Sequence, residues 1–201
     1  MLFNKNNLII AGITSKKTFR PELSAVLFKT DRTVATDSYS LIEVKNPDYM
    51  QDAEFPTIEG EEVKREINEI IPRKSVLKAC KNLSKVKNQA LEVLQNAVLL
   101  EGEQVGLATT DLEKIYIVRT RKVDGEYPDY KQAIPSDYSE HKTVTVDVKR
   151  LKELLSILDK MDIKEKQIEF YIKDGSLPLV IKAVTVQKQE ITAMLMPIKN
   201  I

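Results

Sequence analysis

Basic side chains gather in one stretch of the sequence, RKSVLKACKNLSKVK at residues 73–87. This stretch contains no acidic residue, and its cations are Arg73, Lys74, Lys78, Lys81, Lys85 and Lys87. The stretch at residues 48–69 has the opposite character, because its acidic residues far outnumber Lys64 and Arg65. The formal net charge of +1 therefore conceals one strongly basic stretch and one strongly acidic stretch. Segregation of this kind indicates one surface for a polyanion such as a phosphate backbone, although a solvated helix face explains the same pattern.

Residues that could perform catalysis are few. The one histidine, His141, lies in the polar stretch SDYSEHKT without a serine or cysteine motif, which argues against a nucleophile paired with a base. Asp37 and Asp111 lie in similar turns, where aspartate usually accepts backbone N–H bonds. GITSKK lacks the spacing of a phosphate-binding loop, and a single Cys80 excludes an intrachain disulfide or a cysteine-rich zinc site. We expect no enzyme activity, no cofactor and no metal.

The stretch VDGEYPDYKQAIP at residues 123–135 combines a glycine, two tyrosines and two prolines. Proline fixes φ near both ends, and Gly125 permits a sharp turn. The segment is therefore expected to hold a fixed shape on a surface. It is either a rigid connector between domains or part of a binding site.

Length and composition limit the class of protein. A chain of 201 residues with 42% hydrophobic and 30% charged residues is typical of a soluble globular protein with one large or two small domains. No apolar run approaches the roughly 20 residues that a membrane helix needs, and MLFNKNNLIIAG is too short in apolar residues for a signal peptide. We expect a cytoplasmic protein that does not bind membranes.

Most of the chain has the pattern of short strands. These segments are rich in β-branched residues and bounded by turn residues, and they lie at residues 23–30, 32–39, 41–44, 67–71, 91–100, 104–108, 114–120, 143–148, 167–173, 179–186 and 191–196.

Two segments have helical spacing instead. The first, after Pro72, has the apolar stripe Val76, Leu77, Cys80 and Leu83, and the second, after a capping Asp147, has the stripe Leu151, Leu154, Leu155 and Leu158. We expect helices at residues 73–84 and 149–160, side by side on one face and backed by antiparallel sheet.

The order of elements repeats along the chain. Residues 67–120 and 143–196 each give a strand, a helix and then three or more strands, so each is a βαβββ unit. The stretch before Asp48 gives a third, abbreviated copy in which NLIIAGITSK is a short helix. ATDSYSLIEV at residues 35–44 also resembles ATTDLEKIYIV at residues 108–118.

Four motifs in order give a specific resemblance: RTVATDSYSLIEV, INEIIPRKSVLKACKNL, VDGEYPDYKQAIP and the terminal AMLMPIKNI. Together they resemble the β sliding clamp of bacterial DNA polymerase III. The resemblance implies an α+β DNA-clamp fold made of repeated βαβββ half-units, with helices on one face of antiparallel sheets. It implies a clamp domain at residues 1–137, similar to the family's middle domain, and a half domain at residues 138–201, similar to the end of its last domain.

The resemblance also implies two sites. A pocket for short linear motifs of DNA polymerase and the clamp loader would be formed by Thr36, Ser38, Tyr39, Leu41, Pro128, Gln132, Ala133, Met194, Met196, Pro197 and Ile198. Non-specific contacts to duplex DNA would come from Arg73, Lys74, Lys78, Lys81, Lys85, Lys149, Arg150 and Lys152. Ser38 and Ser40 depart from the family's usual Gly and Arg, which leaves open whether the partner motif is the usual one of the family.

The chain also departs from the family in length, because the counterparts of the first domain and of half the last domain are missing. The resemblance implies rings of twelve half-units, which four chains of three would supply. Three chains would suffice if residues 45–66 held a fourth, degenerate unit. The function is therefore expected to be that of a homo-oligomeric processivity clamp that encircles duplex DNA, or of a non-encircling adaptor or decoy that keeps the peptide pocket.

Overall fold

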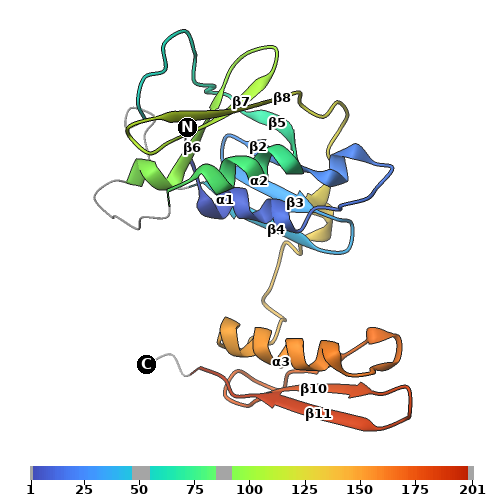
Figure 1. The fold of residues 1–201 in the computed structure, drawn as a ribbon. Coiled ribbons are helices and arrows are strands. Elements are labelled where there is room, and N and C mark those ends of the chain that lie inside the picture. The colour runs from blue at the N-terminus through green and yellow to red at the C-terminus, as the bar shows by residue number, and fades with distance from the viewer. Residues whose placement is uncertain (1, 47–54, 85–91, 199–201) are drawn as a thin grey trace. The chain divides into compact units, whose positions relative to one another are not determined.

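The computed structural model describes residues 2–46, 55–84 and 92–198. The chain divides into two compact units, Met1–Ala133 and Ile134–Ile201, which we call unit 1 and unit 2 and describe separately. Unit 1 contains two half-units of the same order (Figure 1). The first half-unit comprises β1 (Leu2–Asn4), α1 (Lys5–Ile9), β2 (Ala25–Lys29), β3 (Arg32–Thr36) and β4 (Leu41–Lys45). The second comprises β5 (Asn68–Pro72), α2 (Arg73–Asn82), β6 (Asn96–Leu100), β7 (Val105–Thr110) and β8 (Ile115–Thr120).

The two half-units exchange their first strands. The sheets have the orders β1-β6-β7-β8 and β4-β3-β2-β5, so each three-stranded meander is extended by the strand that opens the other half-unit. All pairs are antiparallel, with Leu2 opposite Val98 and Ile70 opposite Leu27. The exchange supplies an outer strand to each sheet and joins the two half-units into one domain.

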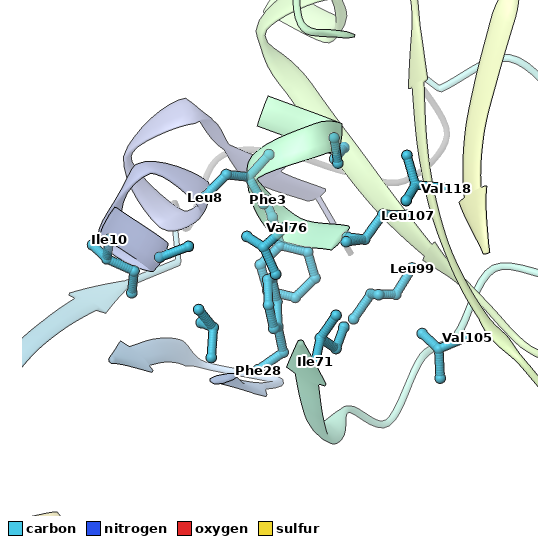
Figure 2. Close-up of a cluster of buried hydrophobic side chains, with 14 of the residues drawn as sticks. Phe3, Leu8, Ile10, Phe28, Ile71, Val76, Leu99, Val105, Leu107 and Val118 are labelled. Atoms are coloured by element: carbon cyan, nitrogen blue, oxygen red, sulfur yellow. The ribbon is translucent and has the colours of Figure 1, made fainter. Parts of the chain in front are cut away.

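A single core lies between the half-units (Figure 2). Phe3 of β1 and Phe28 of β2 are fully buried and meet edge to face, with ring centroids 4.9 Å apart. Leu8 of α1 and Val76 of α2 join the same cluster, because α1 and α2 are neighbours in space. Each half-unit therefore completes the apolar core of the other.

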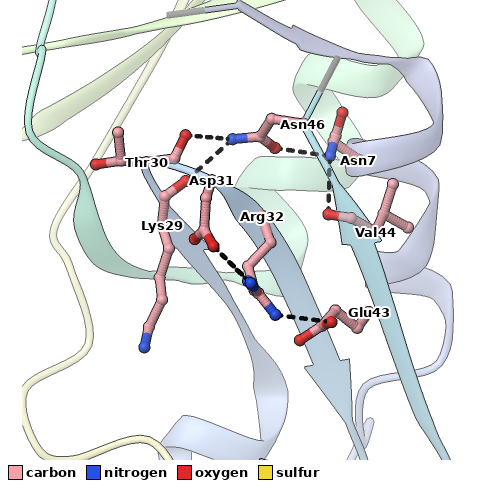
Figure 3. A network of polar contacts seen from close by, with 8 residues as sticks. All are labelled: Asn7, Lys29, Thr30, Asp31, Arg32, Glu43, Val44 and Asn46. Atoms are coloured by element: carbon pink, nitrogen blue, oxygen red, sulfur yellow. Dashed lines mark hydrogen bonds and ion pairs between the residues drawn. The ribbon is translucent and has the colours of Figure 1, made fainter. Parts of the chain in front are cut away.

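Asparagine side chains fix α1 to its sheet. Asn4 accepts from the backbone N–H groups of Asn6 and Asn7, and the Asn7 side chain accepts from the Asn4 N–H, which forms a capping box. The buried Asn7 amide also donates to Thr33 Oγ1 at 3.0 Å. It donates to Asn46 Oδ1 at 3.0 Å as well (Figure 3). These bonds satisfy a buried polar group that would otherwise destabilise the core.

The helix α2 confirms the helix that the spacing of apolar residues predicted. Val76, Ala79 and Leu83 are buried, while Leu77 and Cys80 are half-buried against the same core. Pro72 is the N-cap residue, where a missing N–H costs nothing.

Unit 2 is a single half-unit. It comprises α3 (Val148–Lys160) and a sheet of order β11-β10-β9, with β9 (Glu169–Tyr171), β10 (Leu179–Val184) and β11 (Glu190–Leu195). Asp147 caps α3 as predicted, since its Oδ1 accepts from the Arg150 N–H at 2.8 Å. Leu151, Leu154, Leu155 and Leu158 pack on the sheet around Ile181.

Short 3-10 helices complete the described secondary structure of the two units: η1 (Ile10–Gly12), η2 (Pro21–Ser24), η4 (Glu92–Gln95), η5 (Tyr130–Ala133) and η6 (Lys164–Lys166).

Several sequence predictions need correction. The first half-unit is not abbreviated, because β1 precedes a helix that starts at Lys5 rather than at Asn7. Residues 143–148 do not form a strand, because Val148 already belongs to α3 and residues 143–147 have no strand partner. The described residues 55–66 contain no helix, and only Val63 forms a bridge, to Leu100. This part of the chain gives no support for a fourth half-unit.

The shared core predicts a large effect of truncating Phe28. Phe28→Ala removes a fully buried ring and leaves a cavity against Phe3, so we expect a loss of about 3–5 kcal/mol in the free energy of unfolding. Urea denaturation followed by circular dichroism measures the change. Phe19→Ala is the matched control, because the Phe19 ring is fully exposed, and a loss of similar size in both variants would contradict the assignment of this core.

Candidate functional site

Two turns of unit 1 share one hydrogen-bond pattern. In the turn between β3 and β4, Thr36 Oγ1 donates to the Ser40 carbonyl at 2.8 Å, and Asp37 Oδ1 accepts from the N–H groups of Tyr39 and Ser40. In the turn between β7 and β8, Thr110 and Asp111 make the same bonds to the residues at the same spacing. Backbone hydrogen bonds therefore lower the pKa of both Asp37 and Asp111. The predicted echo between these stretches is confirmed, and both aspartates have structural roles.

Both turns place a non-glycine residue in the left-handed region. Ser38 has φ of 79° and Leu112 has φ of 76°. L-residues are disfavoured there by contact between Cβ and the backbone. The conformation explains why a glycine suits the Ser38 position.

The loop at residues 122–131 lies against the sheet that contains β3. The Tyr127 hydroxyl donates to the Val34 carbonyl at 3.3 Å, and the Val123 N–H donates to the Ile70 carbonyl at 2.8 Å. Burial raises the pKa of Tyr127 well above its usual range. The loop is therefore held to this sheet at two points, the middle of β3 and the outer strand β5.

Charged residues surround the ring of Tyr130. Arg32 donates to Asp31 Oδ2 at 2.7 Å and to Glu43 Oε1 at 2.9 Å (Figure 3). Those two bonds raise the pKa of Arg32.

The Tyr130 ring lies next to this ion-pair group. Lys29 Nζ lies 6.0 Å from the centroid of the ring. The buried Tyr130 hydroxyl and Glu43 Oε2 have no hydrogen bond of good geometry. Burial raises the pKa of Tyr130. The cluster links η5 to β2, β3 and β4.

A hollow of about 590 Å³ opens beside this loop. It is lined by Leu27 and Lys29 of β2, Asn68–Ile70 of β5 and residues 122–131. Its charged groups have both signs, and the lining includes Pro128 and Tyr130. The hollow is thus a mixed polar and apolar surface on one side of the loop.

The structure brings together only some of the predicted pocket residues. Thr36, Ser38, Tyr39 and Leu41 share one turn, and Pro128, Gln132 and Ala133 belong to the loop and η5, but only Pro128 lines the hollow. Tyr39 is almost fully exposed. Met194, Met196, Pro197 and Ile198 belong to unit 2, so their union with the other residues stays a prediction.

Seven of the eight predicted DNA contacts lie on the helices α2 and α3. Lys74, Lys78 and Lys81 are exposed on α2, and Lys149, Arg150 and Lys152 are exposed on α3. None of these six forms an ion pair with another described residue. Arg73 differs, because its Nε donates to the Ala11 carbonyl at 3.1 Å and so closes the end of the first helical segment. Lys85 lies outside the described residues.

Sequence reasoning missed the lining from β2 and β5 and the cluster of Arg32, Glu43 and Tyr130. No local signal links Tyr130 to Glu43, because they meet only through tertiary packing. The other titratable residues that the structure describes give no site. Burial raises the pKa of Cys80, His141 contacts Tyr138, and the described residues contain no group of ligands that could hold a metal ion.

Solved structures have a similar fold. The DNA polymerase sliding clamp from Pseudomonas aeruginosa is similar with a TM-score of 0.66 and 18% identity over 98% of this chain. The sliding clamp from Bacillus subtilis has a TM-score of 0.63 and 20% identity over 98% of this chain, and the β subunit of DNA polymerase from Streptococcus pyogenes has 0.64 and 15% over 99%.

The chain has the fold of a bacterial DNA polymerase sliding clamp. The predicted α+β clamp fold is therefore confirmed. The chain spans about half the length of these clamps, because the matches cover 48–50% of their chains. No protein-family model and no curated protein matches the sequence.

Across the described part of the clamp-like chain, the helices are too short or too polar for any of them to cross a lipid bilayer.

The strained turn of this clamp fold predicts a stabilising substitution. Ser38→Gly removes the Cβ from a residue with φ of 79°, so we expect the free energy of unfolding to rise by about 1 kcal/mol. The midpoint of urea denaturation measures the change. Ser40→Gly is the control, because Ser40 is outside the left-handed region and the added freedom of the unfolded chain should lower stability. A stabilisation by Ser40→Gly equal to that by Ser38→Gly would contradict the role of strain.

Proposed function

We propose that the protein is a sliding-clamp-like processivity factor for a DNA polymerase. It would encircle duplex DNA as a homo-oligomeric ring in the cytoplasm and hold the polymerase through a short peptide motif. The observation that carries the proposal is the division of α2 and α3, in a clamp fold, into an apolar side and a basic side. Each helix packs its apolar stripe on a sheet and leaves basic side chains exposed and without described ion-pair partners.

The chemistry of these cations suits a sliding contact. Lysine is a hydrated point charge on a flexible stem, so it binds phosphates through water or directly without fixing a position along the duplex. Phosphate contacts also carry no direct base information. A ring lined by such side chains would be retained by topology and remain free to move. Catalysis is not part of this function.

The peptide site would use both units. The turn at residues 36–41 together with Pro128, Gln132 and Ala133 would provide one wall. The other wall would be provided by Met194, Met196, Pro197 and Ile198. The exposed methionines support this proposal, since each is 62% exposed and methionine adapts to varied apolar partners. DNA polymerase and a clamp loader are the proposed partners.

A second candidate is a non-encircling adaptor that binds replication proteins through the same peptide site. The observation that favours it is length, because the chain spans about half of the clamps it matches. Analytical ultracentrifugation of the full chain separates the two functions. An assembly of several chains is expected for the ring, whereas a monomer at all concentrations favours the adaptor.

Charge reversal on α2 tests the DNA interface. Lys78→Glu with Lys81→Glu should weaken duplex binding equally for all sequences, because both side chains are exposed and should bind phosphates. The slope of log K against log salt should become shallower by about 0.9 for each phosphate that the variant no longer binds. Fluorescence anisotropy with two unrelated duplexes measures both quantities.

The matched control reverses two exposed lysines that lie outside α2 and α3, Lys45→Glu with Lys114→Glu. It makes the same change in net charge and should reduce affinity far less. Equal losses of affinity in the two double variants, or a loss confined to one duplex sequence, would contradict the proposed interface.

The C-terminal part of the peptide site is tested by Met196→Asp. Removing the last eight residues is unsuitable, because β11 runs to the buried Leu195 and the cut would remove two paired residues of the sheet. Removing an apolar interaction worth about 1.5–3 kcal/mol should weaken binding of a Gln-Leu-apolar peptide roughly 10- to 100-fold. Isothermal titration calorimetry measures the affinity.

Val186→Asp is the control for this substitution. Val186 is also an exposed apolar residue of unit 2, but it lies outside the predicted pocket. Unchanged binding by Met196→Asp would place the partner site elsewhere.

A further inference from the structure

Unit 2 has the register of the half-units in unit 1. The pairs Leu179 with Leu195 and Val184 with Glu190 correspond to Val105 with Thr120 and Thr110 with Ile115, at the two ends of strands of equal length. On the other side, Phe170 opposite Ile181 corresponds to Leu99 opposite Leu107 and to Phe28 opposite Thr33. Each residue of β9 therefore has a counterpart in β2 and in β6.

Residues 143–146 occupy the place of an opening strand. The Ile198 N–H donates to the Thr145 carbonyl at 2.8 Å, just as the Val123 N–H donates to the Ile70 carbonyl of β5. Both opening segments lead directly into a helix, through the N-cap residues Asp147 and Pro72. However, β5 pairs along its length with β2, whereas residues 143–146 pair with no described strand.

The missing partner leaves core residues of unit 2 in solvent. Phe28 and Leu99 are completely buried, but their counterpart Phe170 is 51% exposed. Leu151 and Leu154 of α3 are half-buried, although Val76 and Ala79 at the same positions of α2 are completely buried. Since the other half-unit buries these positions in unit 1, unit 2 exposes the surface that a second half-unit covers.

We propose that unit 2 of a second copy of this chain covers this surface. Residues 143–146 of each copy pair antiparallel with β9 of the other copy, so that the exchange of first strands within unit 1 is repeated between two chains. The register of β5 on β2 transfers directly and places Val146 opposite Ile168, Thr145 opposite Glu169 and Val144 opposite Phe170.

A second copy fits because unit 2 is self-complementary. It presents both an unpaired opening segment and an unpaired β9 edge among its described residues, so one twofold axis satisfies both at once and closes the assembly. The two pairs on the helix side of the sheet, Val146 with Ile168 and Val144 with Phe170, are apolar on both chains. The pairing segments carry a single charge, Glu169, and the residues that flank the opening segment, Lys142 and Asp147, carry opposite charges.

The pairing itself needs no DNA and no peptide. It can therefore be tested separately from the proposed function.

Substitution of Phe170 in the full chain tests the interface. The wild-type chain should form a concentration-dependent dimer, or a larger assembly built from dimers, in analytical ultracentrifugation. Phe170→Asp buries a carboxylate in the paired state only, so the dissociation constant of the dimer should rise by at least about 100-fold. Tyr171→Asp is the matched control, because Tyr171 is 50% exposed on the same strand but faces away from the helix.

A disulfide tests the register without disturbing Phe170. In a Cys80→Ala background, Thr145→Cys with Glu169→Cys should give a covalent dimer under oxidation, because directly paired residues in antiparallel strands have a suitable Cα separation. Thr145→Cys with Thr192→Cys should give none. A wild-type monomer at all concentrations would overturn the proposal and leave the surface to a half-unit of another protein. A dimer that tolerates Phe170→Asp and lacks the selective disulfide would also overturn it.

Discussion

The exchange of first strands is the interaction on which unit 1 depends. It adds β1 to the sheet of the second half-unit and β5 to the sheet of the first. The same exchange brings Phe3 against Phe28 and Ile71 into the common core. Neither half-unit could bury its apolar residues alone, because α1 and α2 each cover only part of the space between the sheets. The positions of the helices, and hence of their cations, follow from this exchange.

The sequence predicted the parts of the fold that local patterns determine. The stripe from Val76 to Leu83 and the cap at Asp147 predicted α2 and α3 closely, because helical periodicity and capping act within a few residues. The strand β1 was missed, since three residues are too few to show a period and their partner β6 is distant in sequence. Residues 143–148 have the alternation of a strand, but a strand also needs a partner to pair with, and no described strand pairs with residues 143–147.

The candidate sites were predictable to different degrees. Asp37 and the Tyr127-Pro128 loop carry local conformational signals, so the turn and the stiff loop could be anticipated. The cluster of Arg32, Glu43 and Tyr130 could not, because it depends on strand register and on where the loop packs. Basic residues also separate into two groups: Arg73 and Arg32 are engaged in structural bonds, while the lysines of α2 are exposed.

The long separation between β1 and β6 has a consequence for folding kinetics. Leu2 pairs with Val98 across a long stretch of intervening chain, and closing so long a loop costs conformational entropy before the pairing gains anything. During synthesis on the ribosome, the first half-unit would emerge with its β2 edge open until β5 follows. Exposed strand edges are prone to aggregate. The nascent chain is therefore a natural client for chaperones over the interval in which these two half-units are translated.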